Sequence, residues 1–246
     1  MSTKTSIILC TYNEVYYIKN TVEQIQKIIP NLELIIVDDN STDGTQDIIN
    51  QINEEKKIKV IYRKKARGLA SALLRGIIES SGDYIGWLDT NMTESVPQFK
   101  EMFNSLKLDN DIVILSRYVE GGNDKRKLLR SLTSKYFNIL CKFMLQLPIK
   151  DLTSGIFLMK RKVFDEVTFV ASGHGEFFIE FIDNAHRKGF KIKEIPFLQF
   201  TDDKHGTSKT APNLMKFVYL GLTYLIRIIF TIIRRKKVFL RKKEEL

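Results

Sequence analysis

The sequence predicts an α/β fold in which a mostly parallel sheet is covered by helices on both faces. Short apolar runs of strand length, rich in β-branched residues, occur at residues 6–10, 34–37, 59–62, 84–88 and 112–115. Segments with helical periodicity separate them, as in the first interval, where one helix face collects Ile18, Val22, Ile25, Ile28 and Ile29. Strands that alternate with helices are typical of βαβ units and a parallel sheet.

A chain of 246 residues is long enough for one such domain with a complete core and a short appendage. The composition, 43% hydrophobic and 28% charged, excludes a largely disordered protein. We expect the α/β domain over residues 1–210 and a membrane-associated C-terminal segment over residues 211–246.

The positive charge is concentrated at the C-terminus. Of the formal net charge of +10, residues 204–246 contribute +9, from 11 Lys and Arg against two Glu. A basic tail on a nearly neutral body attracts an anionic partner, either lipid headgroups or nucleic acid. Composition alone does not distinguish the two.

The two cysteines, Cys10 in an apolar run and Cys141 in a helical pattern, lack a second pair that would complete a metal site. Both are interpreted as buried thiols. The N-terminal apolar run stops at Cys10 and is too short for a signal-peptide core, so we expect the chain in the reducing cytosol.

The residues directly after four of these apolar runs are unusually polar and rich in hydrogen-bonding side chains. These stretches are TYNE at 11–14, DDNSTDGT at 38–45, DTN at 89–91 and SRY at 116–118. In a parallel α/β sheet the ligand crevice lies outside the carboxyl ends of the strands, so chemistry is expected there. Asp38 and Asp39 are suited to accept hydrogen bonds from a nucleotide base or ribose, although a turn that caps the next helix is the alternative. Asp89 is suited to hold a divalent ion that bridges two phosphates.

Two further segments have amphipathic character. Residues 125–146, followed by Pro148, predict a basic amphipathic helix that either meets a membrane or covers the core with a solvated basic face. Residues 217–233 are nearly all apolar and are followed by basic clusters at 234–237 and 241–243. The polar exceptions, Lys216, Thr223, Arg227 and Thr231, fall on one helix stripe.

This striped C-terminal helix favours an interfacial position on the cytoplasmic face of an anionic membrane, peripheral or monotopic. The alternatives are a helix that packs in a bundle or homo-oligomer, and a helix that spans the bilayer, for which 17 apolar residues are marginal. No nucleic-acid partner is expected, because the basic residues flank an apolar helix instead of alternating with exposed aromatic side chains.

The ordered motifs resemble those of glycosyltransferase family 2, most closely its dolichyl-phosphate mannose synthase-like branch. The matching stretches are TYNE at 11–14, VDDNSTDGT at 37–45, RGLASA at 67–72, LDTN at 88–91, SRY at 116–118 and DLTSG at 151–155. The resemblance covers roughly residues 5–210. It implies a GT-A fold, a nucleotide-diphospho-sugar donor, a lipid acceptor such as a polyprenyl or dolichyl phosphate, and inversion at the anomeric carbon.

On the matching positions, the resemblance implies that Tyr12 and Glu14 contact the nucleoside, Asp39 the base, Asp89 the metal and donor, and Arg117 the phosphates. The complete expected donor-binding set is Thr11, Tyr12, Glu14, Asp38, Asp39, Arg67, Gly68, Asp89, Thr90, Asn91, Arg117, Lys204, His205, Ser208 and Lys209.

Two positions depart from the family pattern. Asn91 stands where a second carboxylate is usual, so the expected ligands of a divalent cation, Mg²⁺ or Mn²⁺, are Asp89 and Asn91. Asp203 stands where an arginine would fall in the stretch at 202–209, which leaves diphosphate neutralisation to Lys204, His205 and Lys209 together with Arg117.

The acceptor decides whether a base is needed. A lipid phosphate is already ionised, so its glycosylation requires only positioning and stabilisation of the departing diphosphate. A hydroxyl of a lipid-linked or surface glycan would need a general base, for which Asp151 and Glu176 are the candidates. His174 and His186 are interpreted as structural.

Two alternative functions belong to other classes of protein, and the first of them remains open. The departures at Asn91 and Asp203 keep open a non-catalytic, nucleotide-binding membrane scaffold. A nicotinamide dehydrogenase is disfavoured, since no GxGxxG follows the first strand.

Overall fold

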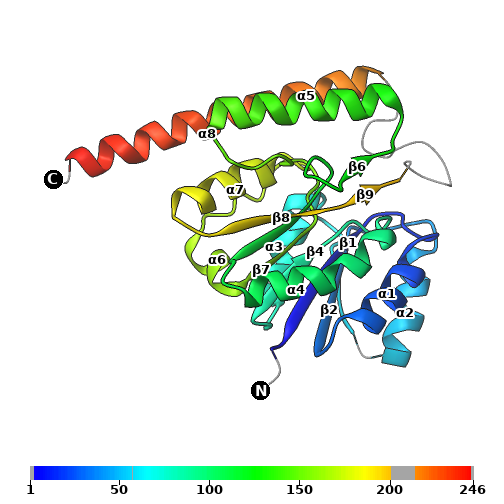
Figure 1. Cartoon of the computed structure of the whole chain (residues 1–246). Helices are drawn as coiled ribbons and strands as arrows, with labels where there is room; N and C mark the ends of the chain where they lie inside the picture. Colours follow the sequence, from blue (N-terminus) through cyan, green and yellow to red (C-terminus); the bar gives the residue numbers. More distant parts are fainter. Residues whose placement is uncertain (1–2, 57, 201–213, 245–246) are drawn as a thin grey trace.

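The computed structural model describes residues 3–56, 58–200 and 214–244. A seven-stranded sheet with the order β3-β2-β1-β4-β7-β5-β8 forms its centre (Figure 1). The strands are β1 (Thr5–Thr11), β2 (Leu32–Asp38), β3 (Lys59–Tyr62), β4 (Tyr84–Trp87), β5 (Ile112–Ser116), β7 (Phe157–Lys160) and β8 (Ile192–Pro196). All five strands expected from the apolar runs are present, and the mostly parallel sheet is confirmed.

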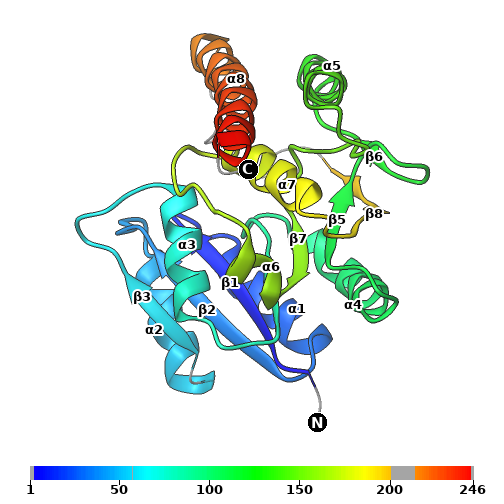
Figure 2. The same cartoon turned by 90° about the vertical axis from the view of Figure 1, so that its left-hand side faces the viewer.

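Both faces of the sheet are buried, because successive residues of a strand point to opposite sides. In β1, Ile8 belongs to one core cluster, while Ile7 and Leu9 belong to the other. The cluster around Ile7 is closed by α1 (Ile18–Ile28), α2 (Thr45–Lys56), η1 (Thr93–Gln98) and α4 (Phe99–Lys107). The cluster around Ile8 is closed by α3 (Leu69–Glu79), α6 (Arg161–Glu166) and α7 (Phe177–Arg187) (Figure 2).

Strand β7 runs antiparallel to both of its neighbours, β4 and β5. Its direction brings the preceding stretch, residues 151–156, to the edge where the parallel strands end. Gly155 allows a close approach there, with a φ of +74°, and a Cβ at this position would lie 2.7 Å from the ring of Trp87. The DLTSG stretch therefore reaches the expected ligand edge from the opposite direction to the other motifs.

Helices α5 (Leu128–Leu145) and α8 (Leu214–Glu244) lie along one side of the α/β body, away from the N-terminus (Figure 1). The expected basic helix is shorter than the predicted residues 125–146, and the C-terminal helix is longer than the apolar run at 217–233. At the start of α5, β6 (Asn123–Asp124) pairs in parallel with β9 (Leu198–Gln199). Figure 2 shows α5 and α8 as two separate rods above α7.

The two outer helices expose apolar side chains. On α5 the exposed set is Leu128, Leu129, Leu132, Tyr136, Ile139, Leu140 and Phe143, and on α8 it is Met215, Tyr219, Leu222, Ile226, Ile229, Phe230 and Ile233. The polar stripe expected on α8 exists, but Thr231 is buried and Arg227 binds α7, so at these positions the stripe faces the protein. Within the described ranges, no helix has both the length and the apolar character required to cross a membrane.

Candidate active site

A cavity of about 550 Å³ lies at the carboxyl edge of the sheet, where the loops after β1, β2, β4 and β5 meet. Most of the expected donor-binding residues line it: Thr11, Tyr12, Glu14, Asp39, Arg67, Gly68, Asp89, Thr90, Asn91 and Arg117. Asp39, Asp89 and Arg117 follow three different strands and share this one cavity, as the strand-end argument requires. The expected residues Lys204, His205, Ser208 and Lys209 lie outside the described residues.

Asp39 is held in a fixed orientation at the cavity wall. Its two oxygens accept hydrogen bonds from Arg63 Nε at 2.6 Å and Arg63 Nη2 at 2.8 Å, and the Gly68 amide donates at 2.8 Å. A carboxylate has about four acceptor positions, so Asp39 keeps capacity for a ligand. Beside it, the Arg67 guanidinium lies 3.8 Å from the centre of the Tyr12 ring. Arg63 was missed by the sequence analysis, because it follows β3, whose end carries no recognisable motif.

Asp38 organises the loop and does not line the cavity. Its carboxylate accepts from Thr11 Oγ1 at 2.8 Å, from the Ser41 amide at 2.9 Å and from Gln46 Nε2 at 2.9 Å. The expected nucleotide contact is therefore replaced by the turn-forming role for this residue, whereas Asp39 faces the cavity. The reason is the alternation of the strand, which sends neighbouring side chains to opposite sides.

Asp89 lines the cavity together with His174 and Gly175 of the loop before α7. Burial raises the pKa of the Asp89 carboxyl above its ordinary value, and the nearby charge of His174 partly offsets this effect. His174 itself lines the cavity, so a ligand there would lie beside a histidine that the sequence indicated only as structural. The glycines on either side of His174, Gly173 and Gly175, were the sequence signal that could have indicated a loop at a ligand.

Glu176 orders this loop and does not line the cavity. Its Oε2 accepts from the His174 amide at 2.9 Å and from the Gly175 amide at 3.0 Å, and only 6% of the residue is exposed. The expected general base is thus turned toward its own backbone, and it fixes the position of His174.

Arg117 is bound by Asp151 in a fully buried pair. Asp151 Oδ2 accepts from Arg117 Nε at 2.8 Å and Oδ1 accepts from Nη2 at 2.7 Å, while Thr153 Oγ1 and Gln199 Oε1 also accept from the guanidinium. Burial alone would raise the pKa of Asp151, but the charge and hydrogen bonds of Arg117 hold it below the ordinary value. Asp151 does not line the cavity, so its contact with a ligand would run through Arg117.

Two more arginines line the cavity beside α5, and the sequence analysis missed both. Arg126 is paired with Asp124 at 2.6 Å, and Arg130 lies in the first turn of α5. They were not anticipated because basic residues at 125–130 were attributed to the solvated or lipid-facing side of a helix. The packing of α5 over the sheet edge instead brings these two positions to the cavity.

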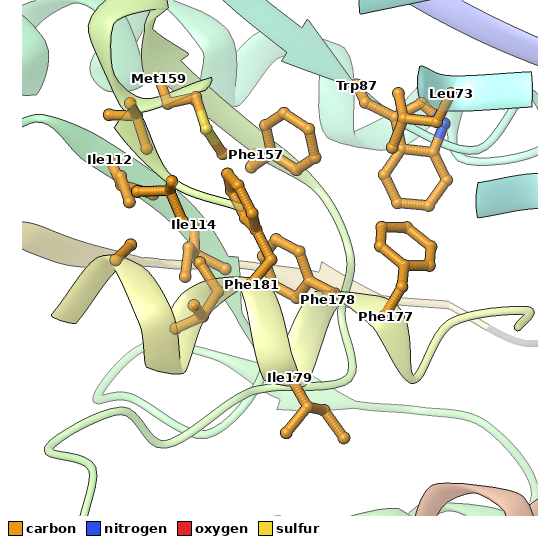
Figure 3. Close-up of a cluster of buried hydrophobic side chains, with 14 of the residues drawn as sticks. Leu73, Trp87, Ile112, Ile114, Phe157, Met159, Phe177, Phe178, Ile179 and Phe181 are labelled. Carbon is orange, nitrogen blue, oxygen red and sulfur yellow. The ribbon is translucent and has the colours of Figure 1, made fainter. Parts of the chain in front are cut away.

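Three buried side-chain polar atoms in the described part of the chain have no hydrogen-bond partner: Trp87 Nε1, Thr90 Oγ1 and Ser154 Oγ. All three residues line the cavity. Figure 3 shows Trp87 beside Phe177 of α7, with ring centres 6.3 Å apart, and Leu73 of α3 belongs to the same core cluster. Because buried polar atoms are nearly always paired, this cavity is built to receive a polar ligand.

The described residues contain no group of three or more His, Cys, Asp or Glu side chains that could hold a metal ion. Asp89 and Asn91 both line the cavity and offer one carboxylate and one amide oxygen. Mg²⁺ is commonly bound by one or two protein ligands together with substrate phosphates and water, so this donor set suits a cation that arrives with a diphosphate.

Comparisons with solved structures concern the fold. Glucosyl-3-phosphoglycerate synthase from Mycobacterium tuberculosis, in complex with Mn²⁺, uridine diphosphate and phosphoglyceric acid, matches with a TM-score of 0.68 at 18% identity, covering 94% of this chain and 78% of that one. Its complex with Mn²⁺, UDP-glucose and phosphoglyceric acid gives 0.67 at 17% identity, covering 94% and 80%. At such low identity the likeness shows the fold alone, and it confirms the fold that the motifs implied.

Two relatives are more similar to this chain in sequence. A dolichol-phosphate mannosyltransferase from Pyrococcus furiosus is 31% identical over 199 residues, which are 79% of this chain and 56% of that protein. A polyprenol monophosphomannose synthase from Mycolicibacterium smegmatis is 27% identical over 214 residues, 84% of this chain and 80% of that protein. The chain thus spans little more than half the length of the Pyrococcus relative. The profile of Glycosyl transferase family 2 matches residues 6–168, well over half of the chain, which therefore belongs to this family.

Proposed function

We propose that this chain is an inverting glycosyltransferase that moves a sugar from a nucleotide-diphospho-sugar to a polyprenyl phosphate at a membrane surface. The observation that carries the proposal is one cavity lined by the carboxylates of Asp39 and Asp89 and by Arg117, Arg126 and Arg130, beside two helices with exposed apolar side chains. The names of the Pyrococcus and Mycolicibacterium relatives support the same acceptor class.

The donor is assigned to the end of the cavity that Tyr12, Asp39 and Arg67 line. Asp39 would accept hydrogen bonds from the base, with its orientation fixed by Arg63, and the aromatic ring of Tyr12 would lie beside the nucleoside. The likeness to a fold that binds uridine diphosphate in Mycobacterium tuberculosis supports a nucleotide at this edge.

Asp89 and Asn91 are the proposed cation ligands. A divalent cation bound there with the donor diphosphate would supply positive charge to the departing group. Burial disfavours the ionised form of Asp89, and a cation would stabilise it. The structural relative named above was solved with Mn²⁺ or Mg²⁺, which supports a divalent cation without selecting one.

Arg117, Arg126 and Arg130 are the proposed binding group for the acceptor phosphate. Guanidinium groups suit phosphate because they offer several N–H donors in a fixed plane. Asp151 and Asp124 hold Arg117 and Arg126 in place, so less conformational freedom is lost when an anion binds. In the transfer step, a phosphate oxygen attacks the anomeric carbon, the bond to the donor diphosphate breaks, and the configuration inverts.

A phosphate acceptor is favoured over a hydroxyl acceptor by the state of the two candidate bases. Asp151 is engaged by Arg117, Glu176 is engaged by backbone amides, and neither lines the cavity. A hydroxyl would need one of them to remove a proton during attack. An ionised phosphate needs no such group, so the arrangement fits it without rearrangement.

The membrane assignment rests on α5 and α8. Both helices expose several large apolar side chains, including Phe143 at 81% and Tyr219 at 69%, while Arg227 faces inward. A helix that only covered the core of a soluble protein would be expected to turn its apolar side chains inward and its charged side chains outward. The exposed apolar side chains would insert into the lipid interface and bring the cavity to a membrane-bound acceptor.

Transfer of radiolabelled sugar to polyprenyl phosphate in vesicles tests the proposal, with polyprenol and glycan acceptors as comparisons. A panel of uridine and guanosine diphosphate sugars, each with Mg²⁺, Mn²⁺ or chelator, first identifies the donor by thermal shift. We expect product on polyprenyl phosphate and none on polyprenol. Product on glycan hydroxyls alone would favour the second acceptor class, and donor that is bound but returned unchanged would favour a scaffold.

A further inference from the structure

Helix α8 is joined to α7 by ion pairs with buried carboxylates. Glu180, whose side chain is 3% exposed, accepts from Arg227 Nη1 at 2.8 Å and also pairs with Arg234. Asp183, fully buried, accepts from Arg235 Nε at 2.7 Å, and Arg235 also reaches the Leu145 carbonyl at the end of α5. These contacts hold α8 in one orientation against both neighbouring helices.

The inner face of α8 also reaches the cavity through Tyr224. The Tyr224 ring packs edge-on against Phe137 of α5, with ring centres 5.5 Å apart. Its hydroxyl lies against Gly175, where an added Cβ would come within 2.2 Å of the oxygen, so only glycine fits there. A residue of the C-terminal helix thus touches the loop that carries His174.

The Tyr224 hydroxyl is available as a hydrogen-bond donor. Burial raises its pKa, and the negative charges of Glu176 and Asp89 raise the pKa further. The phenol therefore keeps its proton throughout the neutral range and can donate one hydrogen bond into the cavity.

Gly221, one helical turn before Tyr224, is exposed and also lines the cavity. A Cβ at Gly221 would meet no atom within 4 Å in the described structure, so close packing does not require glycine here. Glycine is among the least favourable residues in a helix interior. Across from α8, Ser134 and Phe137 of α5 line the same cavity, which places Gly221 at an opening between the two helices.

We propose that α8 forms the acceptor wall of the cavity, with Tyr224 donating a hydrogen bond to the acceptor phosphate and Gly221 leaving room for the lipid to enter between α5 and α8. This inference rests on the proposed function and deepens it. The same helix would meet lipid through its outer face and position the acceptor through its inner face, so attachment and acceptor binding would be one structural unit.

The first test is Tyr224→Phe, which removes the hydroxyl and keeps the ring that packs on Phe137. We expect the KM for polyprenyl phosphate to rise about tenfold, because one hydrogen bond to a charged group is worth about a factor of ten or more. The KM for the donor and the thermal shift with the nucleotide should stay at the wild-type values, which shows that the fold and the donor end are intact.

The second test narrows the opening with Gly221→Ala and Gly221→Leu. Transfer should fall with the size of the side chain, while the melting temperature holds or rises, because alanine and leucine favour the helix. Asn104→Leu, at an exposed position of α4 outside the cavity, is the matched control for adding a leucine to a helix surface, and it should transfer at the wild-type rate.

Failure of the acceptor wall and failure of the proposed function give different results. If the wild-type chain transfers sugar to polyprenyl phosphate, and both Tyr224→Phe and Gly221→Leu do so with unchanged KM and rate, then the acceptor wall is refuted while the proposed function stands. If the wild-type chain glycosylates no polyprenyl phosphate, the proposed function fails, and the acceptor wall fails with it.

Discussion

The two ends of the cavity are built in different ways. The proposed donor end takes Tyr12, Asp39 and Asp89 from loops that follow β1, β2 and β4, three neighbouring parallel strands. The proposed acceptor end takes Arg130 from α5, Ser154 from the stretch before β7 and Tyr224 from α8. The donor end thus depends on the sheet, whereas the acceptor end depends on how three outlying segments pack together.

The two ends also differ in charge and in the way their side chains are held. At the donor end, carboxylates face the cavity and backbone amides or arginines hold them from behind, as Arg63 and the Gly68 amide hold Asp39. At the acceptor end the arginines face the cavity and carboxylates stand behind them, as Asp151 does for Arg117. Under the proposed function, the first arrangement suits a donor that arrives with a cation and offers hydrogen-bond donors, and the second suits an anionic acceptor.

The largest effect on transfer is expected at Asp89, the proposed cation ligand. Asp89→Asn keeps the size of the side chain and removes its charge, so transfer should fall by about 10²–10³-fold. Initial rates of sugar transfer at saturating donor measure the effect. Nucleotide binding in the presence of chelator should be retained, and a variant with the wild-type rate would remove Asp89 from the reaction.

A smaller effect on transfer, together with a loss of stability, is expected at Asp151, which holds Arg117 from the side away from the cavity. Asp151→Asn leaves the buried Arg117 with only the more distant carboxylate of Asp124, 3.6 Å from Nη1, which should cost about 3–5 kcal/mol of unfolding free energy. Denaturant unfolding at neutral pH measures the loss. Since the pKa of Asp151 is lowered by folding, its contribution is complete above the ordinary aspartate pKa and disappears as the pH falls through the lower folded value.

This variant also separates two roles for Asp151. If the residue only positions Arg117, then Asp151→Asn should raise the KM for polyprenyl phosphate and lose stability together. Wild-type stability with abolished transfer would instead indicate a general base and would favour a hydroxyl acceptor.

The membrane face of the acceptor end should respond to Phe143→Glu. Moving an apolar side chain of this size out of lipid costs about 1.5–3 kcal/mol, so vesicle affinity should fall roughly tenfold or more. Leu108→Glu is the matched control, since Leu108 is 78% exposed and Phe143 is 81% exposed, but Leu108 follows α4. Co-sedimentation with anionic vesicles measures both, and equal losses would argue against a specific membrane face.

The smallest effect on transfer is expected at the opposite edge of the sheet. Burial alone would raise the pKa of Glu33, but hydrogen bonds from Ser6, Ser81 and Lys4 lower it to about 2 from the ordinary 4.5. Glu33→Gln should therefore lose about 2 kcal/mol of stability at neutral pH, with unchanged KM values. The difference from wild type should shrink as the pH falls from 4.5 toward 2, which unfolding across that range would show.

The donor end was largely predictable from the sequence. The strand-end motifs correctly predicted that Tyr12, Asp39 and Asp89 are neighbours. Short apolar runs locate the strands in the sequence, and parallel strands end at a common edge of the sheet. The sequence could not separate the roles of Asp38 and Asp39, which depend on the face each side chain takes. Arg63 carried no signal, since its partner Asp39 is distant in the chain.

By itself the sequence determined the alternation of strands and helices, the position of the motifs at strand ends and the amphipathic character of α5 and α8, because these are periodic or local properties. Only the tertiary structure decided that Arg227 faces α7, that Asp151 lies behind Arg117 and that Tyr224 reaches the cavity. Each of these contacts depends on how segments far apart in the chain pack. The helical period predicts which residues share one face of a helix, but it does not predict which other element that face packs against.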